Sequence, residues 1–271
     1  MGDVVTSHRQ ILEFQLAAGV DWPLEDAPVD RFALSAETIA KAEAARPPQP
    51  ERRSESRGTP AAAAAPAPLA PDAAIMEARR LAASAPDLET LRQLLDAFDG
   101  CTLKSTASRL VFADGRPGAP VMIVGEAPGR DEDEIGKPFV GRAGQLLDKM
   151  LGAIGLGRED VYIANTVPWR PPGNRTPTPQ EIAILLPFIS RQIELSGPKI
   201  LLTMGAPATQ TLLGQKEGIL RLRGRWFEYA MGGATIPALA TLHPAYLLRQ
   251  PSQKALAWRD LQALRAKLRQ A

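Results

Sequence analysis

From about residue 72 onward, the chain alternates between short, continuously apolar runs and longer stretches with helical spacing of apolar positions. The runs PVMIVG (120–125), VYIANTV (161–167) and KILLTMG (199–205) have the length and apolar content of buried strands. Strands of this kind that alternate with helices indicate a parallel sheet covered on both faces. We therefore expect an α/β fold with three layers, α/β/α, around a central, mainly parallel sheet of four to five strands.

The flanking segments extend this pattern. GRWFEYA (224–230) and TIPALATLH (235–243) predict two further strands, and SQKALAWRDLQALRAKL (252–268) predicts a closing helix. Before the first strand, SAPDLETLRQLLDAF (84–98) places its large apolar residues on one helical face, with Asp87 among the capping candidates.

The N-terminal part has a different composition. Residues 1–46 contain one short amphipathic helical pattern at 7–20, whereas residues 47–71 contain seven prolines and seven alanines. Proline removes backbone donors and interrupts helices, and this stretch has almost no bulky apolar residue to pack. The sequence therefore predicts a short helical segment, a disordered linker at 47–71 and a folded domain at 72–271.

Composition narrows the class of protein. The chain has 271 residues, 45% of them hydrophobic, and a formal net charge of +2, which does not by itself indicate a polyanionic partner. One cysteine excludes a disulfide within the chain and a metal site built on several cysteines. No apolar run has membrane-spanning length, so we expect no membrane partner. No charged-then-apolar leader opens the chain, so we expect a cytoplasmic protein, and we predict that it is a monomer.

The loop after the first strand, EAPGRDEDEIGKPFVG (126–141), contains glycines for close backbone approach but is rich in carboxylates. A P-loop needs a lysine and a hydroxyl residue at the helix start, and the sequence GRAGQ has neither. The run DEDE could bind a hard cation, although such a run is more often a solvated surface, so we predict no metal. The carboxylate of Glu126 and the ring of Phe139 suit a flat, neutral ring such as a nucleobase.

The later loops add hydrogen-bonding and basic groups at other strand ends. Asn165 can pair with the donor–acceptor edge of a pyrimidine, although an asparagine in a loop commonly bonds local backbone. Arg170 and Arg175 follow it in a proline-rich turn and are expected at the same rim. His243 follows the last strand, and Pro244 stiffens the backbone behind it.

The segment AYLLR (245–249) follows His243 directly. It places two leucines, which we expect to be exposed, beside Arg249. Apolar side chains next to a basic one are typical of a wedge that opens a DNA duplex.

Three motifs, GEAPGRDEDEIGKPFVGRAGQLL, NTVPWRPPGNRTPTPQE and HPAYLLR, together resemble the uracil-DNA glycosylase superfamily, and most closely its family 4. The resemblance covers the chain from about Cys101 to the C-terminus. It implies the same three-layer fold, and hydrolysis of the N-glycosidic bond of uracil, or another deaminated base, in DNA during base-excision repair.

The resemblance also implies roles for single residues. His243 would donate a hydrogen bond to a uracil carbonyl oxygen, Glu126 would line the pocket at the strand end, and Glu132 would hold the pocket and position water. The other implied roles are base binding by Ala127, Phe139 (stacking) and Asn165 (edge recognition), and DNA contacts by Arg170, Arg175, Leu247 (duplex wedge) and Arg249 (phosphate).

The chain departs from family 4 at the iron–sulfur cluster. Members of that family resemble one another in holding a [4Fe–4S] cluster on four cysteines. Here Cys101 stands at one of these positions, and Phe98, Trp169 and Leu185 stand at the other three. A cluster needs thiolate ligands, normally four, so we predict that the cofactor is absent and that apolar packing fills its place.

Two functions therefore stay open at this point. The first is an active DNA glycosylase without a cluster. The second is a non-catalytic reader of damaged or single-stranded DNA that kept the base pocket. Because charge stabilisation needs His243, whereas base reading needs only Asn165 and Phe139, the presence of all three favours the enzyme. A nucleotide hydrolase is disfavoured by the lack of phosphate ligands.

Overall fold

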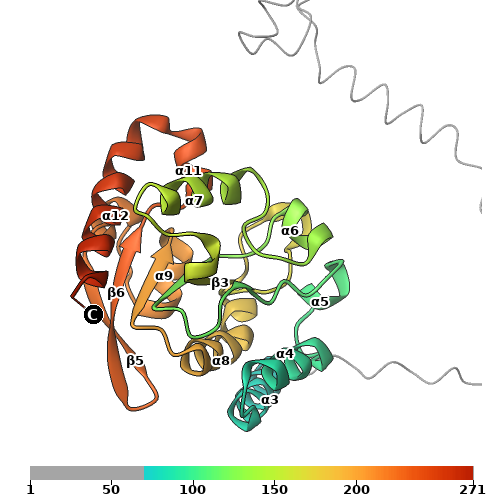
Figure 1. Ribbon diagram of the computed structural model, residues 1–271. Helices are drawn as coiled ribbons and strands as arrows, with labels where there is room; N and C mark the ends of the chain where they lie inside the picture. Colours follow the sequence, from blue (N-terminus) through green and yellow to red (C-terminus); the bar gives the residue numbers. More distant parts are fainter. Residues whose placement is uncertain (1–69, 271) are drawn as a thin grey trace, which may run out of the picture. The chain divides into compact units, whose positions relative to one another are not determined.

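A computed structural model describes residues 70–270 of the protein, which contain a six-stranded sheet flanked by helices (Figure 1). The strand order is β1-β3-β2-β4-β6-β5. The strands are β1 (Asp114–Gly115), β2 (Val121–Gly125), β3 (Val161–Asn165), β4 (Ile200–Met204), β5 (Trp226–Met231) and β6 (Ala234–Thr241). The segments predicted at 7–20 and in most of the 47–71 linker lie outside the described residues.

The four inner strands, β3, β2, β4 and β6, are parallel, and β1 and β5 pair antiparallel at the two edges. The mainly parallel α/β/α architecture is thus confirmed, with one strand more than predicted. The additional strand, β1, is only two residues long and contains no apolar residue, so the hydrophobic pattern carried no signal for it.

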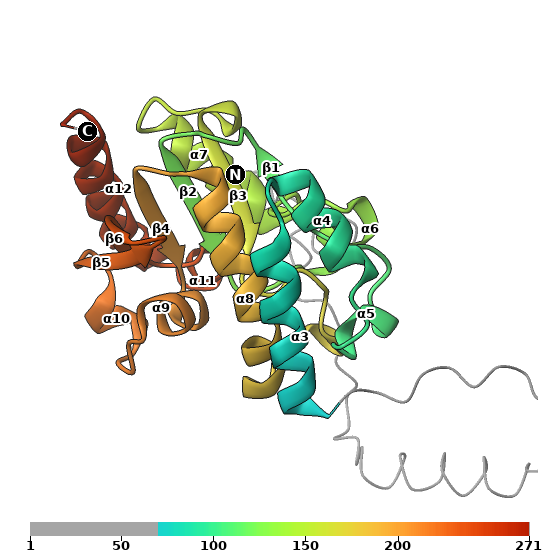
Figure 2. The same ribbon diagram turned by 90° about the horizontal axis from the view of Figure 1, so that it is seen from below.

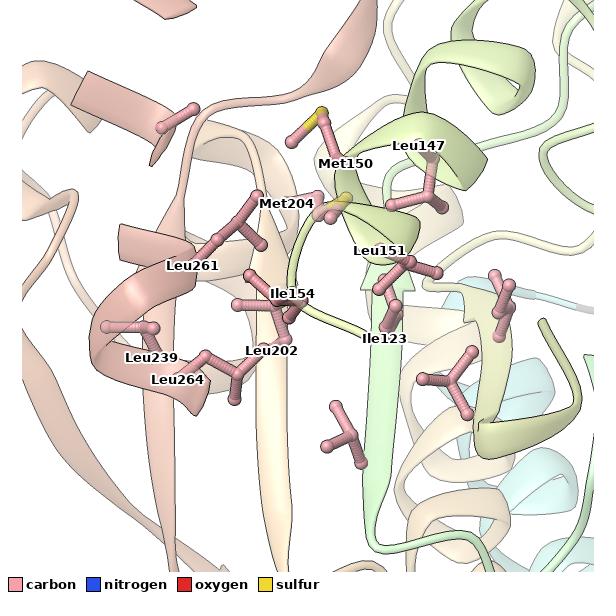
Figure 3. Packing of buried hydrophobic residues seen from close by; sticks show 14 of the residues in the cluster. Ile123, Leu147, Met150, Leu151, Ile154, Leu202, Met204, Leu239, Leu261 and Leu264 are labelled. Atoms are coloured by element: carbon pink, nitrogen blue, oxygen red, sulfur yellow. The ribbon is translucent and has the colours of Figure 1, made fainter. Parts of the chain in front are cut away.

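Side chains alternate between the two faces of the sheet, as the period of a strand requires. Val121 and Ile123 pack on one face against α7 (Arg142–Gly152), α11 (Pro244–Arg249) and α12 (Lys254–Leu268). Figure 3 shows this layer, with Leu147 and Leu151 of α7 and Leu261 and Leu264 of α12 directed toward the strands.

The opposite face is covered by α8 (Pro179–Ser196) and α9 (Ala206–Leu213), and Met122 packs there with Ile189 and Ile193 of α8. Helices α3 (Pro71–Ser84) and α4 (Leu88–Ala97) pack against the outer side of α8 (Figure 2). The predicted cap of α4 is confirmed, since the Asp87 carboxylate accepts a hydrogen bond from the Thr90 amide at 2.8 Å.

Helix α3 was not predicted. Its buried face consists of Ala74, Ala78 and Ala82, whose small side chains give little hydrophobic contrast in an alanine-rich sequence. The helix begins at Pro71, where the fixed φ of proline suits a first helical position.

The parallel strands end at a common edge, where Gly125 is in register with Asn165, and Met204 with Thr241. This edge therefore gathers the loops that the sequence singled out. The connecting segments contain α5 (Leu103–Thr106), α6 (Arg130–Ile135), α10 (Ile219–Leu222) and the short 3-10 turns η1 (Arg158–Asp160), η2 (Pro172–Asn174) and η3 (Pro251–Gln253). Within residues 70–270, no helix combines the length and the apolar character that crossing a membrane requires.

Candidate active site

A cavity of about 430 Å³ lies at the carboxyl edge of the parallel strands, a size suited to a small-molecule or base pocket. The loops after β2, β3 and β6 all contribute to it. Its lining comprises Glu126, Ala127, Pro128, Gly129, Glu132, Phe139, Ala143, Asn165, Pro171, Asn174, Arg175, Thr176, His243, Ala245 and Arg249. All the predicted catalytic and base-binding residues are in this set, and of the predicted DNA contacts Arg170 and Leu247 are not.

Glu132 is a nearly buried carboxylate that organises the first loop. It lies in α6, and one of its oxygens accepts hydrogen bonds from the amides of Val140 and Gly141 at 3.0 and 2.9 Å. The other oxygen accepts from the Gly129 amide at 3.1 Å. Three backbone donors therefore fix this carboxylate, which ties the two ends of the loop together.

The neighbouring acids match our expectation of solvent exposure only in part, since Asp131 and Glu134 are exposed but Asp133 is not. Asp133 is 3% exposed, and its carboxylate accepts hydrogen bonds from the amides of Ser108 and Arg109 at 2.8 and 3.2 Å. The DEDE run is thus partly structural, because it forms the helix α6, whose inner side binds backbone amides. Within the described part of the chain, no group of three or more acidic, histidine or cysteine residues could hold a metal ion.

Phe139 is buried and its ring stacks on His243, with ring centroids 5.3 Å apart and planes inclined by 30°. Gly125, the last residue of β2, lies directly beside it: a Cβ atom at Gly125 would come within 2.7 Å of the ring and 2.5 Å of the Asn165 Oδ1 atom. A glycine is therefore required here if both side chains are to keep their places.

Asn165 ends β3 and is 5% exposed. Among the described residues its side-chain amide has no hydrogen-bond partner, and it borders the cavity. Since no buried side-chain nitrogen or oxygen of the described residues lacks a partner, the Asn165 amide is accessible and can bind a ligand that presents both a donor and an acceptor. The alternative of an asparagine that bonds local backbone is wrong for this side chain.

His243 is the N-cap of α11, and its Nδ1 atom accepts a hydrogen bond from the Ala245 amide at 3.1 Å. An accepting Nδ1 carries no proton, so in the neutral ring the proton is on Nε2. Burial, assisted by the positive charge of Arg249, lowers the pKa of His243 to about 4. The ring is therefore a neutral hydrogen-bond donor at neutral pH.

Glu126 follows β2 directly and is partly buried, and this burial raises the pKa of its carboxyl above the usual value. Its backbone carbonyl accepts hydrogen bonds from the Thr166 hydroxyl and the Val167 amide, at 2.7 and 3.0 Å. These bonds connect the first and second loops, and Glu126 is one of the residues that line the cavity.

Arg175 lies at the rim as predicted, but its guanidinium makes a two-pronged ion pair with Glu181, at 2.8 and 2.6 Å. Glu181 is the N3 residue of α8 and completes a capping box with Thr178. The pair thus ties the pocket-lining turn to α8, a role that the capping-box motif TPTPQE could have indicated. Arg170 donates a hydrogen bond to Asn174 at 2.7 Å and orders the same turn.

Our prediction for Leu247, in the last motif, was wrong. Leu247, which we expected to be exposed as a wedge, is 1% exposed and packs in the core against α7 and α12. A helical turn, α11, forms here, so the two leucines point in different directions and only Leu248 is exposed, at 37%. Arg249 is exposed and borders the cavity, as the sequence predicted.

The four positions that correspond to the cluster ligands of family 4 converge in one apolar cluster. Phe98, Cys101, Trp169 and Leu185 are each at most 4% exposed, and the Phe98 ring lies 5.3 Å from that of Phe188. Burial raises the pKa of the Cys101 thiol to about 11, so the thiol stays protonated at neutral pH. Three apolar side chains and a protonated thiol do not fit an iron–sulfur cluster, which binds thiolates.

Comparison with known proteins agrees with this site. Residues 112–262 match the family model of the uracil DNA glycosylase superfamily. The chain is 38% identical to the type-4 uracil-DNA glycosylase of Pyrobaculum aerophilum over 65% of its own length and 91% of that protein. It is 40% identical to the type-4 enzyme of Thermotoga maritima (62% and 86% covered) and 41% identical to that of Archaeoglobus fulgidus (56% and 78%). The chain therefore belongs to the uracil-DNA glycosylase superfamily.

Proposed function

We propose that the protein is a DNA glycosylase that hydrolyses the N-glycosidic bond of uracil, or of another deaminated base, after the base has flipped out of DNA. The observation that carries the proposal is the neutral His243 ring, which lines the same cavity as Phe139 and Asn165 and accepts from Ala245 at Nδ1. The proton of the ring is then on Nε2, which we propose donates to the base. The relatives named above are all uracil-DNA glycosylases, so they do not support the alternative of a non-catalytic reader of damaged or single-stranded DNA.

The residues support a stepwise account of the reaction. The base enters the cavity, its ring faces Phe139, and its pairing edge meets the Asn165 amide. As the bond between the sugar C1′ and the base nitrogen breaks, its electron pair moves into the base, and a carbonyl oxygen of the base gains negative charge. A donor aimed at such an oxygen stabilises the transition state, and one donor of this kind is typically worth about 3 kcal/mol.

The sugar is left with oxocarbenium character, which nearby negative charge stabilises. Glu126 and the DNA phosphates supply that charge. Water then forms a bond to C1′ and gives up a proton, and the departing base takes up a proton. The Glu132 carboxylate accepts hydrogen bonds from three backbone amides, so we propose that its main role is to maintain the conformation of the loop. Its effect on the position of the attacking water would then be indirect, through that conformation.

We base our proposal for DNA binding on the residues around the cavity. We propose that Arg249 contacts phosphate and that Leu248, in place of the buried Leu247, fills the gap left in the duplex. Arg170 and Arg175 belong to the turn after β3 that contributes to the cavity lining, and they add positive charge there, although the charge of Arg175 is compensated by Glu181. We also propose that the protein acts as a monomer.

We further propose that the enzyme works without an iron–sulfur cluster, since apolar packing connects α3, α4 and α8 where the cluster ligands would stand. Protein purified without oxygen should lack both iron and visible charge-transfer absorption. Iron at four atoms per chain would contradict this part of the proposal while leaving the glycosylase activity open.

The activity is tested with an oligonucleotide that contains one uracil, incubated with excess enzyme and then treated with alkali, which cleaves the strand at the abasic site. We expect cleavage of the uracil strand and none of a matched thymine strand. Binding of the uracil strand without cleavage would favour the reader, and His243→Asn protein serves as the control for contaminating glycosylases.

A further inference from the structure

The stacking residue of the pocket has an unusual backbone. Phe139 has a φ of 54°, in the left-handed region, where a residue with a side chain is strained. Strain of this kind persists only where surrounding groups hold the backbone in place. The position of the ring, stacked on His243, depends on this conformation.

Arg158 holds this part of the backbone in place, although no sequence motif pointed to it. It lies in η1, and its Nη2 atom donates a hydrogen bond to the Phe139 carbonyl oxygen. Its Nη1 atom donates to the Pro138 carbonyl at 3.2 Å. The guanidinium thus binds two consecutive carbonyls of the pocket loop.

The guanidinium is itself fixed from two other elements. Nη1 also donates to Asp114 of β1 at 2.6 Å, and Nε donates to Asp148 of α7 at 3.0 Å. Its side chain is 23% exposed, and two carboxylates compensate its charge. A planar, charged fork is suited to this task, because it can satisfy several acceptors in fixed directions.

The peptide group that joins Phe139 to Val140 is held on both sides. Arg158 binds its carbonyl oxygen, and Glu132 accepts from its N–H at 3.0 Å. Helix α7 approaches the same carbonyl so closely that a Cβ atom at Gly144 would lie 1.6 Å from the oxygen. The orientation of this peptide is therefore determined by Arg158, Glu132 and Gly144 together.

We propose that Arg158 is a positioning residue for excision: it locks the Phe139–Val140 peptide in the strained orientation that presents the Phe139 ring to the base. The inference rests on the proposed function, because the ring matters only if a base enters the cavity. Arg158 does not border the cavity, so its effect on the reaction passes through Phe139.

The test compares Arg158→Ala and Arg158→Lys with two control variants. Arg116→Ala removes an exposed arginine whose Nε donates to the Glu159 carbonyl at 3.1 Å, and Asp148→Asn removes an ion pair while leaving both loop carbonyls bound. Each protein is assayed for single-turnover excision at saturating enzyme, for its dissociation constant for the uracil strand, and for inhibition by free uracil.

We expect Arg158→Ala to lower the single-turnover rate by at least about tenfold, because small displacements of a reacting group cost that much or more. Inhibition by free uracil should weaken. The dissociation constant for DNA should change by less than about threefold, since Arg158 does not border the cavity and two carboxylates compensate its charge. Arg158→Lys, which can bind one carbonyl, and methylguanidinium added to Arg158→Ala should each restore part of the rate. Arg116→Ala should match the wild type. Asp148→Asn removes the charge of one of the two carboxylates that fix the guanidinium, and it should therefore lower the rate less than Arg158→Ala does.

Two results would overturn the proposal. One is a folded Arg158→Ala protein with unchanged rate and unchanged inhibition by uracil. The other is a joint loss of stability, DNA affinity and rate that neither lysine nor methylguanidinium repairs, which would make Arg158 merely structural. If the wild type neither excises nor binds uracil, the proposed function fails first, whereas an active wild type with insensitive Arg158 variants refutes the positioning role alone.

Discussion

Two neighbouring regions of the domain are built on opposite principles. The first loop of the pocket is held by directed polar contacts, such as those of Glu132 with three amides. The apolar cluster of Phe98, Cys101, Trp169 and Leu185 is held by volume and burial. Both regions contact the segment at 165–176, which enters the pocket at Asn165 and the apolar cluster at Trp169.

The difference shows what each region can tolerate. Directed contacts fix atoms to within fractions of an ångström, and a catalytic pocket requires this. The apolar cluster, in contrast, only has to fill the volume beside α8, and hydrophobic side chains can do this in many combinations. Packing without a cofactor is therefore compatible with an intact pocket. Mutations in the cluster should change mainly stability, and mutations in the pocket mainly the rate of excision.

The largest effect is expected in the apolar cluster. Leu185→Ala should lower the free energy of unfolding by about 2 to 5 kcal/mol, because Leu185 is fully buried and its removal leaves a cavity. Urea unfolding measures this loss. At a temperature where the variant is still folded, its single-turnover rate should remain close to that of the wild type; a rate that falls with stability intact would show that the cluster shapes the pocket.

In the pocket, His243→Asn should produce the reverse pattern. Asparagine is a good N-cap and can replace the bond from Ala245, so stability should be retained, but the Nε2–H donor is lost. We expect the single-turnover rate to fall by about a hundredfold or more, as for one lost oxyanion donor. His243→Ala provides the contrast, because it removes both the donor and the cap. An unchanged rate for His243→Asn would exclude His243 from the chemistry.

A smaller effect is expected at the rim. Leu248→Ala should lower excision from duplex DNA by roughly threefold to tenfold and leave single-stranded substrate unaffected, since a wedge acts only where bases are stacked. Leu220→Ala is the matched control, because Leu220 is also an exposed leucine but borders no part of the cavity. Equal losses on both substrates would argue against a wedge at this position.

Much of this arrangement could be predicted from the sequence because it depends on local patterns. The strand ends at Gly125 and Asn165 follow apolar runs, and parallel strands bring their carboxyl ends together. The exposure of Leu247 could not be predicted so simply, because it depends on whether AYLLR is a loop or a turn of helix. Arg158 was missed for a similar reason: its partners Asp114, Pro138 and Phe139 are distant in the sequence, and no motif connects them.

The smallest effect, and the last comparison of the two regions, concerns pH. With a pKa of about 4, His243 is neutral in the folded protein throughout the neutral range, and the Cys101 thiol, with a pKa of about 11, is also uncharged. Neither region should therefore titrate between pH 6.5 and 8, and the single-turnover rate at saturating enzyme should be flat over this interval. Toward lower pH the rate should fall as His243 and Glu126, whose pKa burial raises above its usual value, become protonated.

The free energy of unfolding should also depend on pH through His243, and it should fall as the pH falls. The unfolded chain binds a proton at His243 as the pH falls through about 6.5, whereas the folded protein does so only near pH 4, so this histidine lowers stability progressively between these values. Urea unfolding of the wild type and of His243→Asn at several pH values measures the contribution. A rate inflection near pH 6.5 that disappears in His243→Asn would show that the imidazole is charged in the working enzyme, and the neutral-donor mechanism would then be wrong.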